Sequence, residues 1–508
     1  MLGRAHSIGL RGLDAYPVQV EIDISAGLPG FSVVGLPDGA VRESRERVCA
    51  AVRNSGYRLP SRRITVNLAP AQSRKQGGHF DLPIAMALLS ASGQARPSEE
   101  NLKACLLGEL ALDGTLRPAQ GVLAMALEAK ARGFDTLMVP SANAAEAQAS
   151  GLRALAVDNL RQAVETLSGE RPALEPAAGG SDRAGAASQH DLSDVKGQRA
   201  AKRALEIAAA GGHNLLLIGP PGVGKSMLAK RLVSLLPDPS PEERVEISVM
   251  RSLSGGCEGL ASGRPFRSPH HSASVAALVG GGPSSRAGEA ALAHGGVLFL
   301  DELAEFSRSS LEALRQPLED FRVSVARARE AVEYPARFML VAASNPCPCG
   351  WRGHPEKACL CTTPAVRKYL GRLSGPWLDR IDLQVELSPV SFEQWAGEGP
   401  DPNWSSRAVR SRVMEARQRQ RRRFEGRPFE LNALIPSAEL RALCALDDAG
   451  RAMLEQYSRR LQLTARSLDR VLKVSRTIAD LSGADRIEGA HLTEALQYRS
   501  LERLAETA

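Results

Sequence analysis

The stretch that decides the fold of this chain reads Gly219-Pro-Pro-Gly-Val-Gly-Lys225-Ser226. It matches G-x-x-x-x-G-K-[ST] and lies between an apolar run, Leu215–Ile218, and a helical pattern, Met227–Leu236. Glycines let backbone N–H groups close around phosphate oxygens, and the helix N-terminus adds partial positive charge. The residues expected to bind the phosphates of ATP are Gly219, Pro220, Pro221, Gly222, Val223, Gly224, Lys225 and Ser226, with the Ser226 hydroxyl on Mg²⁺.

Length and composition limit the class of protein. A chain of 508 residues is too long for one core, so about two to four domains are expected. No apolar run approaches the roughly 20 residues that cross a bilayer, and Met1–Gly12 lacks a signal-peptide core. We therefore expect a cytoplasmic protein with no membrane partner. In that compartment its eight cysteines are expected to be reduced or metal-bound rather than disulfide-bonded.

The positive charge of the chain is local. The formal net charge is +7, and the segment Arg407–Arg427 holds nine arginines against two glutamates. The rest of the chain therefore carries equal numbers of basic and acidic residues. Within this segment, 405–424 predicts a helix with an apolar stripe formed by Val409, Val413, Ala416, Gln420 and Phe424. The crowded arginines favour contact with a nucleic-acid backbone, although a solvated helix face remains the alternative.

Residues 1–167 predict a compact α/β domain with its own core. The expected strands are Val18–Ile24, Gly30–Val34, Arg63–Asn67, Ala104–Leu112 and Thr136–Val139, and the expected helices are Gly39–Ser55, Leu82–Ser92 and Val122–Arg132. Residues 168–190 are rich in Gly, Ala, Pro and Ser and are read as a linker. A second α/β domain, a P-loop NTPase core with a parallel sheet, is expected over 191–390, with helix Arg199–Ala210 before the phosphate-binding loop.

Polar residues follow two further apolar strands of this second domain. Asp301 and Glu302 come directly after Gly295–Leu300, which is the Walker B pattern. Asp301 is expected to hold Mg²⁺ and Glu302 to activate the attacking water as general base. Asn345 follows the strand Arg337–Ala343, where its amide could contact the γ-phosphate and the water. Capping of the next turn is the alternative role for Asn345.

Two segments of the second domain are candidates for contact with a substrate. The polar, Gly-rich stretch Ser248–Gly288 is expected to be a mobile loop or a subunit contact. Its adjacent His270 and His271 point in different directions in any regular element, so metal binding by this pair is disfavoured. Residues Arg322–Glu333 predict a β-hairpin with Arg327 and Arg329 near its tip. In ring helicases such a hairpin enters the pore.

Four cysteines lie close together in the sequence after Asn345. They form two C-x-C pairs, Cys347/Cys349 and Cys359/Cys361, separated by nine residues. Two close pairs at this distance could make a tetrahedral zinc site, with His354 as a spare ligand. The C-x-C spacing is tighter than the usual C-x-x-C, so a structural Zn²⁺ and reduced thiols both remain open.

Two arginines outside the phosphate-binding loop are candidate catalytic residues. Arg380 follows Leu378-Asp379, and in ring ATPases such an arginine points into the neighbouring subunit's nucleotide site. A salt bridge with Asp379 or Asp382 is the alternative. Residues 391–430 are read as a basic helical connector, and 431–508 as a helical lid. Arg466 opens a lid helix and is expected to reach the γ-phosphate.

Together these motifs resemble the YifB/ComM family of Mg-chelatase-like AAA+ ATPases. The resemblance covers nearly the whole chain and rests on Gly219–Ser226, Arg264–His271, Gly295–Glu302, Asn345–Gly350, Gly375–Asp382 and Arg476–Leu481. It implies a homohexameric ring with ATP and Mg²⁺. It also implies ATP-driven DNA branch migration or helicase action that aids integration of DNA during natural transformation, without sequence-specific contacts.

Residues 1–167 resemble the Lon-protease-like domain at the start of these ATPases. In Lon the nucleophilic serine lies in a Gly-Pro-Ser-Ala-Gly turn, and the matching stretch here, Gly77–Asp81, has His79 at that position. The lysine that follows a Gly-Gly-Leu turn in Lon is also missing, because Leu123 follows Gly121-Val122. The domain is therefore expected to be proteolytically inactive.

Three functions are compatible with these features. A DNA motor accounts for the arginine-rich helix and the hairpin. A protein-remodelling ATPase is suggested by the Lon-like domain, but no aromatic pore loop is evident. A Mg-chelatase motor subunit is disfavoured, because the chain has no integrin-like domain and carries extra N-terminal and cysteine segments.

Overall fold

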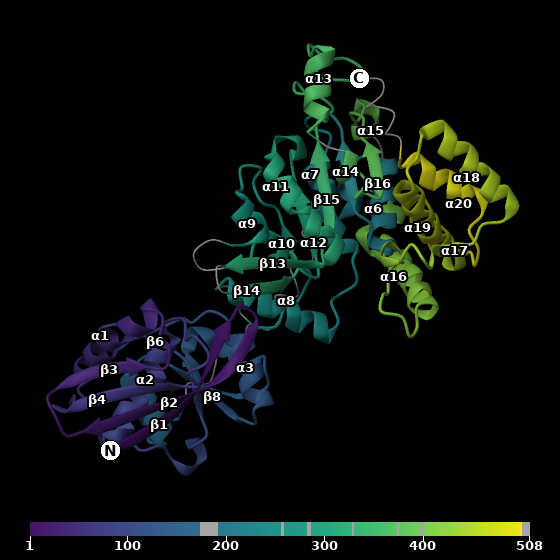
Figure 1. The fold of residues 1–508 in the computed structure, drawn as a ribbon. Coiled ribbons are helices and arrows are strands. Elements are labelled where there is room, and N and C mark those ends of the chain that lie inside the picture. Colours follow the sequence, from purple (N-terminus) through teal and green to yellow (C-terminus); the bar gives the residue numbers. More distant parts are fainter. Residues whose placement is uncertain are drawn as a thin grey trace.

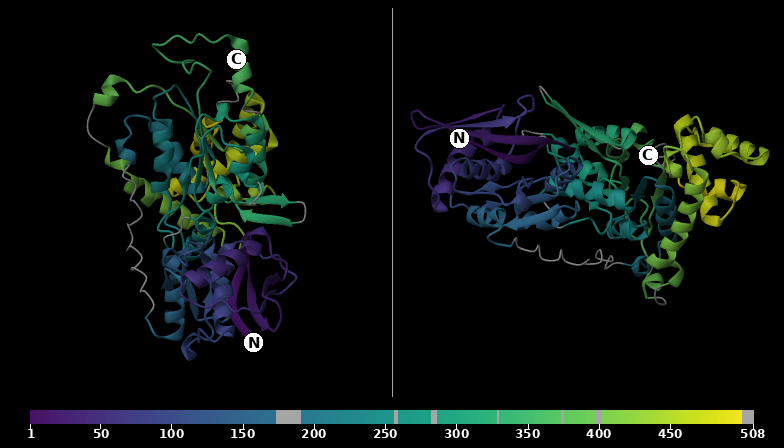
Figure 2. Two further views of the ribbon diagram at one scale, coloured as in Figure 1. Left: turned by 90° about the vertical axis from the view of Figure 1, so that its left-hand side faces the viewer. Right: turned by 90° about the horizontal axis from the view of Figure 1, so that it is seen from below.

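The computed structural model describes residues 1–172, 191–255, 259–281, 286–327, 330–372, 375–396 and 401–499. Figures 1 and 2 show three parts that follow one another in space as they do in sequence: an N-terminal α/β domain, a central α/β domain and a set of C-terminal helices. Most of the expected linker, from residue 173 onward, lies outside the described residues, as does Arg329.

The N-terminal domain is built on a mixed seven-stranded sheet among the residues described. In spatial order its strands are β3 (Gly30–Val34), β4 (Arg63–Ala69), β2 (Asp14–Ser25), β1 (Leu2–Arg11), β5 (Cys105–Leu106), β8 (Thr136–Pro140) and β9 (Arg153–Val157). Its α-helices are α1 (Gly39–Asn54), α2 (Asp81–Ala91), α3 (Val122–Ala131), α4 (Ala144–Gln148) and α5 (Leu160–Ser168). Every residue of α2 except Ser90 is buried, so this helix forms the centre of the domain's core.

The expected single strand Ala104–Leu112 is wrong. The structure has two short strands instead, β5 and β6 (Glu109–Leu110), and β6 pairs with β7 (Leu116–Arg117) in a separate small sheet. The chain turns between them because Gly108 donates its N–H to the His79 carbonyl and accepts from the Leu82 N–H. β1, β9, α4 and α5 were not predicted from the sequence.

The central domain has the parallel sheet that the sequence predicts. Its strand order is β11 (Phe266–Arg267), β12 (Val297–Leu300), β15 (Met339–Ser344), β10 (Leu215–Ile218) and β16 (Leu383–Glu386), and all pairs are parallel. Side chains alternate between its faces. Leu215 and Leu217 pack with α6 (Arg199–Gly211) and α7 (Lys225–Leu235), whereas Leu216 and Ile218 belong to a second cluster on the opposite face.

That opposite face is covered by short helices. They are α8 (Pro241–Leu253), α9 (Val275–Val279), α10 (Glu289–Leu292), α11 (Arg308–Ala313), α12 (Arg315–Asp320) and α14 (Gly375–Leu378). The expected loop Ser248–Gly288 is therefore only partly a loop: its first six residues complete α8, whose N-terminus is fixed by a capping box at Ser240, and β11 adds an edge strand. Two further helices, α13 (Thr363–Leu370) and α15 (Phe392–Ala396), follow β15 in the sequence.

The expected β-hairpin is confirmed. It consists of β13 (Arg322–Arg327) and β14 (Glu330–Pro335), and its base pairs Arg322 with Pro335. Figures 1 and 2 show it beside the N-terminal domain, away from the main sheet. Gly12, in the turn between β1 and β2, lies directly against Val332 of β14. The N-terminal domain also contacts α8, where the Gly121 N–H donates to the Ser252 carbonyl (3.1 Å).

The C-terminal part is helical, as predicted. Its helices are α16 (Ser406–Arg423), α17 (Leu440–Leu443), α18 (Asp448–Leu461), α19 (Ala465–Ser482) and α20 (Gly489–Gln497). All five residues of the apolar stripe predicted for α16 are buried. Val409, Val413 and Ala416 of that stripe join the same core cluster as α6 and α7, so α16 fixes the C-terminal helices to the central domain.

Candidate nucleotide-binding site

The phosphate-binding loop lies between β10 and α7. Gly222 (φ 84°) and Gly224 (φ 93°) adopt left-handed backbone conformations that disfavour any other residue. The Lys225 ammonium folds back on this loop and donates to the carbonyls of Gly219 (2.5 Å) and Pro220 (2.9 Å). Burial lowers the pKa of Lys225, an effect that Asp301 and Glu302 oppose. A ligand with negative oxygens at this position would satisfy the lysine better than two neutral carbonyls do.

The parallel register brings the predicted polar residues to the same place. Ile218 pairs with Ser344 and Leu300 with Ala342, so the residues after β10, β12 and β15 meet at one edge of the sheet. Asn345 Oδ1 accepts from Lys225 Nζ (3.0 Å), and the Ser226 hydroxyl donates to Asp301 Oδ2 (2.6 Å). A serine hydroxyl beside a carboxylate oxygen is a donor set suited to Mg²⁺.

These side chains line one open cavity of about 350 Å³. Its lining residues are Pro221, Gly222, Gly224, Lys225, Ser226, Met227, Asp301, Glu302, Ser344 and Asn345. The N-terminus of α7 faces this loop, which adds an anion-binding dipole to the lysine charge. The residues present therefore fit the phosphates of a nucleotide with a divalent cation, and Glu302 lies at the cavity as a candidate base.

Two residues of this region were not predicted as part of the site. Gln198 Nε2 donates to the carbonyls of Ser388 (2.7 Å) and Val223 (3.4 Å), so the lead-in to α6 supports the phosphate-binding loop from behind. His271 Nδ1 lies 3.0 Å from Glu302 Oε2. Neither the contacts of Gln198 nor that of His271 could be predicted from the sequence, because each joins segments that are distant along the chain.

The predicted Arg380 and Arg466 do not line this cavity. Arg380 is buried and forms an ion pair with Glu319 (2.5 Å) rather than with Asp379 or Asp382. It lines a different cavity of about 770 Å³ between the central domain and the C-terminal helices. Arg466 is exposed at the start of α19.

Comparisons with known proteins relate this chain to Mg-chelatase-like proteins. A family model described as "Magnesium chelatase, subunit ChlI" matches residues 191–395, "Subunit ChlI of Mg-chelatase" matches 20–143, and the ChlI C-terminal model matches 403–499. The chain is 46% identical to protein YifB of Escherichia coli K12 over 506 residues, covering 99% of this chain and 98% of YifB. It is 43% identical to competence protein ComM of Haemophilus influenzae, covering 99% of both chains.

The chain belongs to the YifB/ComM family. A Mg-chelatase-like AAA+ protein of this family is expected to have ATPase activity, which the site described above supports. A weaker match joins this chain to DNA repair protein RadA of Mycolicibacterium smegmatis, at 31% identity over 152 residues and 30% of each chain. No helix in the described part of this YifB/ComM chain is long and apolar enough to cross a bilayer.

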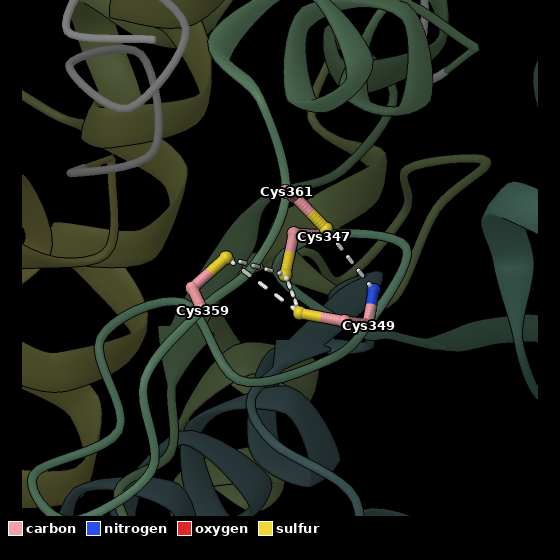
Figure 3. A group of neighbouring side chains, drawn as sticks. All are labelled: Cys347, Cys349, Cys359 and Cys361. Atoms are coloured by element: carbon pink, nitrogen blue, oxygen red, sulfur yellow. Dashed lines mark hydrogen bonds between the residues drawn. The ribbon is translucent and has the colours of Figure 1, made fainter.

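The four predicted cysteines of this YifB/ComM chain lie together (Figure 3). Their ligand atoms all lie within 4.8 Å of one another, and Cys347 Sγ is 3.4 Å from Cys349 Sγ and 3.6 Å from Cys359 Sγ. A tetrahedron with Zn–S bonds of about 2.3 Å has S–S edges of about 3.8 Å, so the cluster has nearly the size of a zinc site. His354 does not belong to this group, and its Nδ1 accepts from the N–H groups of Glu356 and Lys357.

Most arginines of the basic segment are engaged within the molecule. The pairs are Arg410 with Asp238, Arg412 with Glu206, Arg417 with the Ala209 carbonyl, Arg419 with the Gly483 carbonyl, Arg423 with Asp480, and Arg427 with Glu439. Among the described residues, Arg407, Arg421 and Arg422 are exposed and have no such partner. The charge of α16 thus serves mainly to hold the C-terminal helices, and only part of it is free for a polyanion.

His79 is buried in the N-terminal domain, and its Nε2 has no hydrogen-bond partner among the described residues. Burial lowers its pKa from 6.5 to about 4. The unfolded chain therefore binds a proton between these pH values that the folded domain does not, and stability falls as pH falls from 6.5 toward 4. We expect a loss of about 3 kcal/mol over this window.

The measurement is urea unfolding of wild type and His79→Gln between pH 4 and pH 7, with an NMR titration of the His79 imidazole. The variant should lose less stability on acidification. Equal pH slopes in the two proteins, or an imidazole that titrates near 6.5, would contradict the burial argument.

Proposed function

We propose that this chain is an ATP-dependent DNA motor that works as a homohexameric ring and moves branched DNA, aiding integration of DNA during natural transformation. The observation that carries the proposal is a site with phosphate loop, magnesium ligands and candidate base together in a chain of the YifB/ComM family. The names of two similar proteins, competence protein ComM and DNA repair protein RadA, support DNA as the partner.

The proposed hydrolysis uses the residues at the end of the parallel sheet. The phosphate-binding loop and Lys225 bind the triphosphate, and Ser226 and Asp301 hold Mg²⁺. The cation neutralises phosphate charge when bound. Glu302 takes the proton of the attacking water, and Asn345, already bonded to Lys225, orients the water and the γ-phosphate.

The position of the two arginines supports the proposed ring. Arg380 and Arg466 lie away from their own chain's nucleotide cavity, so we assign them to the nucleotide of a neighbouring subunit. For Arg380 this requires release from Glu319, whose half-exposed carboxylate can be solvated instead. An arginine supplied in this way stabilises charge on the transferring phosphoryl group.

DNA contact is assigned to two surfaces. The first is the hairpin β13–β14, which projects from the central domain. The second is the exposed side of α16 that carries Arg407, Arg421 and Arg422. Such contacts neutralise phosphates and do not read base sequence.

We assign residues 1–167 to an inactive Lon-protease-like docking domain, 168–190 to a linker, 391–430 to a connector and 431–508 to a lid. The protein is placed in the cytoplasm, where both ATP and DNA are available.

Two alternative functions can be distinguished from a DNA motor by the ligand that stimulates ATP hydrolysis. A protein-remodelling ATPase is favoured by the N-terminal domain, which packs directly on the hairpin. A chelatase subunit is favoured by the names of the matching family models. DNA should raise the rate of ATP hydrolysis if the proposal is correct. Stimulation by an unfolded polypeptide or by a chelatase partner, with no effect of DNA, would favour the alternatives.

We also propose that the four-cysteine cluster holds a structural Zn²⁺. Four thiolates of nearly tetrahedral spacing suit this ion better than Mg²⁺ or Ca²⁺, which prefer oxygen ligands. The cluster follows Asn345 directly, and Gly350 packs against Pro221 of the phosphate-binding loop with no room for a side chain. A zinc ion would thus stabilise the loop that carries Asn345.

The test is the metal content of protein purified without added metal. We expect about one zinc per chain in wild type and none in Cys359→Ser/Cys361→Ser. The matched control is Cys49→Ser, a half-buried thiol of the N-terminal domain that should leave the zinc content unchanged. Wild-type protein without zinc would refute the site.

A further inference from the structure

The segment 346–372, which contains the four cysteines and α13, carries an excess of positive charge. We call this segment the cysteine module. Its one acidic residue is Glu356, and its five basic residues are Arg352, Lys357, Arg367, Lys368 and Arg372. None of these charged residues lines the nucleotide cavity. The excess of four positive charges is therefore not explained by the nucleotide site.

The cysteine cluster fixes the orientation of α13. Val366 of this helix is buried against Cys347, in a small core cluster to which the other three cysteines also belong. Tyr369, three residues further on, is buried in the core of the central domain. Positions three apart share one face of a helix, so this face is held on both sides. The remaining faces of α13 are turned toward solvent.

The basic residues on those faces are available to a ligand. Arg367 and Lys368 are exposed, and neither forms an ion pair with a described residue. Lys357 is also exposed, and its Nζ lies 4.0 Å from the centre of the Trp351 ring. Surfaces of ordinary soluble proteins mix charges of both signs, whereas one sign gathered on a small surface favours a partner of opposite charge. The module is therefore suited to a polyanion.

The cysteine module lies far from the hairpin. Figures 1 and 2 show α13 at the end of the central domain away from the N-terminal domain and from the hairpin β13–β14. A branched DNA has several arms that leave the branch point in different directions. A surface at each end of the central domain can hold different arms, which the hairpin alone cannot do.

The module is joined directly to the nucleotide site. It begins at the residue after Asn345, and its Gly350 packs against Pro221 of the phosphate-binding loop. At its other end, Arg372 Nη1 donates to the carbonyl of Ala304 (2.9 Å), in the turn that follows Glu302. A ligand on the module would thus lie on the same rigid piece of structure that supports the catalytic loops.

We propose that the cysteine module is a further DNA-contact surface, on which Lys357, Arg367 and Lys368 bind backbone phosphates of one arm of a branched DNA. The inference rests on the proposed function, because it takes DNA as the polyanion. Such contacts are independent of base sequence. In this role the four-cysteine cluster holds the basic faces of α13 in place for the DNA.

The experiment measures binding of a fluorescent three-strand DNA junction to full-length wild type and to Arg367→Gln/Lys368→Gln over a range of salt concentrations. Glutamine is a good helix former, so α13 should be retained. Loss of two phosphate contacts should reduce the slope of log affinity against log salt by about two. At about 0.15 M salt the Kd should rise about ten- to thirtyfold.

The matched control is Arg459→Gln/Arg460→Gln, which removes the same charge from two adjacent exposed arginines of α18. This variant should bind the junction with the wild-type slope and affinity. The proposal is overturned if Arg367→Gln/Lys368→Gln also binds like wild type, or if both variants lose affinity equally.

A contact with a neighbouring copy of the chain is the competing use of this surface, and Leu360 of the module, 90% exposed, is the residue that such a contact would cover. Light scattering on DNA-free protein decides between the two. A smaller assembly in Arg367→Gln/Lys368→Gln and in Leu360→Ala, with an unchanged salt slope, would overturn the DNA contact. Failure of the proposed function would look different, because wild type itself would then not bind the junction.

Discussion

Replacing Glu302 by Gln should lower the ATPase rate by about 10²- to 10⁴-fold, the usual contribution of a general base. ATP binding should remain, because the groups assigned to the phosphates and Mg²⁺ are Lys225, Ser226 and Asp301. Glutamine preserves the length of the side chain, but it cannot take a proton. The measurements are the steady-state rate of phosphate release and the affinity for a fluorescent ATP analogue.

The matched control is Glu305→Gln, an exposed glutamate three residues further along the same turn that bonds to Arg372 (3.3 Å). This variant should hydrolyse ATP at nearly the wild-type rate. If Glu302→Gln kept more than a tenth of wild-type activity, the base would have to be another group, since the loss expected for a base is larger.

Arg380→Ala should also abolish hydrolysis while leaving ATP binding intact, with a loss of about 10³- to 10⁵-fold. The structure places Arg380 in the cavity between the central domain and the C-terminal helices, away from its own chain's phosphate loop. The fold should tolerate the change, because the side chain of Glu319, its ion-pair partner, is 52% exposed and can be hydrated. Arg337→Ala is the matched control, an exposed arginine that lines the same cavity.

The trans assignment is tested by mixing two inactive proteins. Lys225→Ala subunits lack a working phosphate loop but supply Arg380, whereas Arg380→Ala subunits supply an intact loop. Mixed rings should recover part of the wild-type rate, and the recovery should depend on the mixing ratio. Mixed assemblies, verified by pull-down of differently tagged chains, that stay inactive at every ratio would show that Arg380 does not act across a subunit interface.

The sequence was informative wherever function depends on short-range pattern. The phosphate-binding loop, Asp301, Glu302 and Asn345 each follow an apolar strand, and a parallel sheet brings the carboxyl ends of its strands to one edge. The grouping of the four cysteines could be predicted for a similar reason. The two C-x-C pairs are close in the sequence, so a single turn of the chain brings them together.

Long-range contacts explain what the sequence did not show. The contact between His271 and Glu302 depends on the register of a strand with two residues, β11, which is too short to produce a periodic pattern. The arginines of α16 looked free because their partners, such as Glu206 and Asp480, lie more than fifty residues away. For Arg380, the alternative to a role at a neighbouring nucleotide was a salt bridge with Asp379 or Asp382, but the fold pairs it with Glu319 instead.

The measurement that tests the central proposal most directly is ATP-dependent strand exchange on a labelled three-strand DNA junction, comparing wild type with Lys225→Ala. Wild type should move the junction when ATP is present, and Lys225→Ala should not. If wild type leaves the junction in place and DNA does not change its rate of ATP hydrolysis, the chain is not a DNA motor.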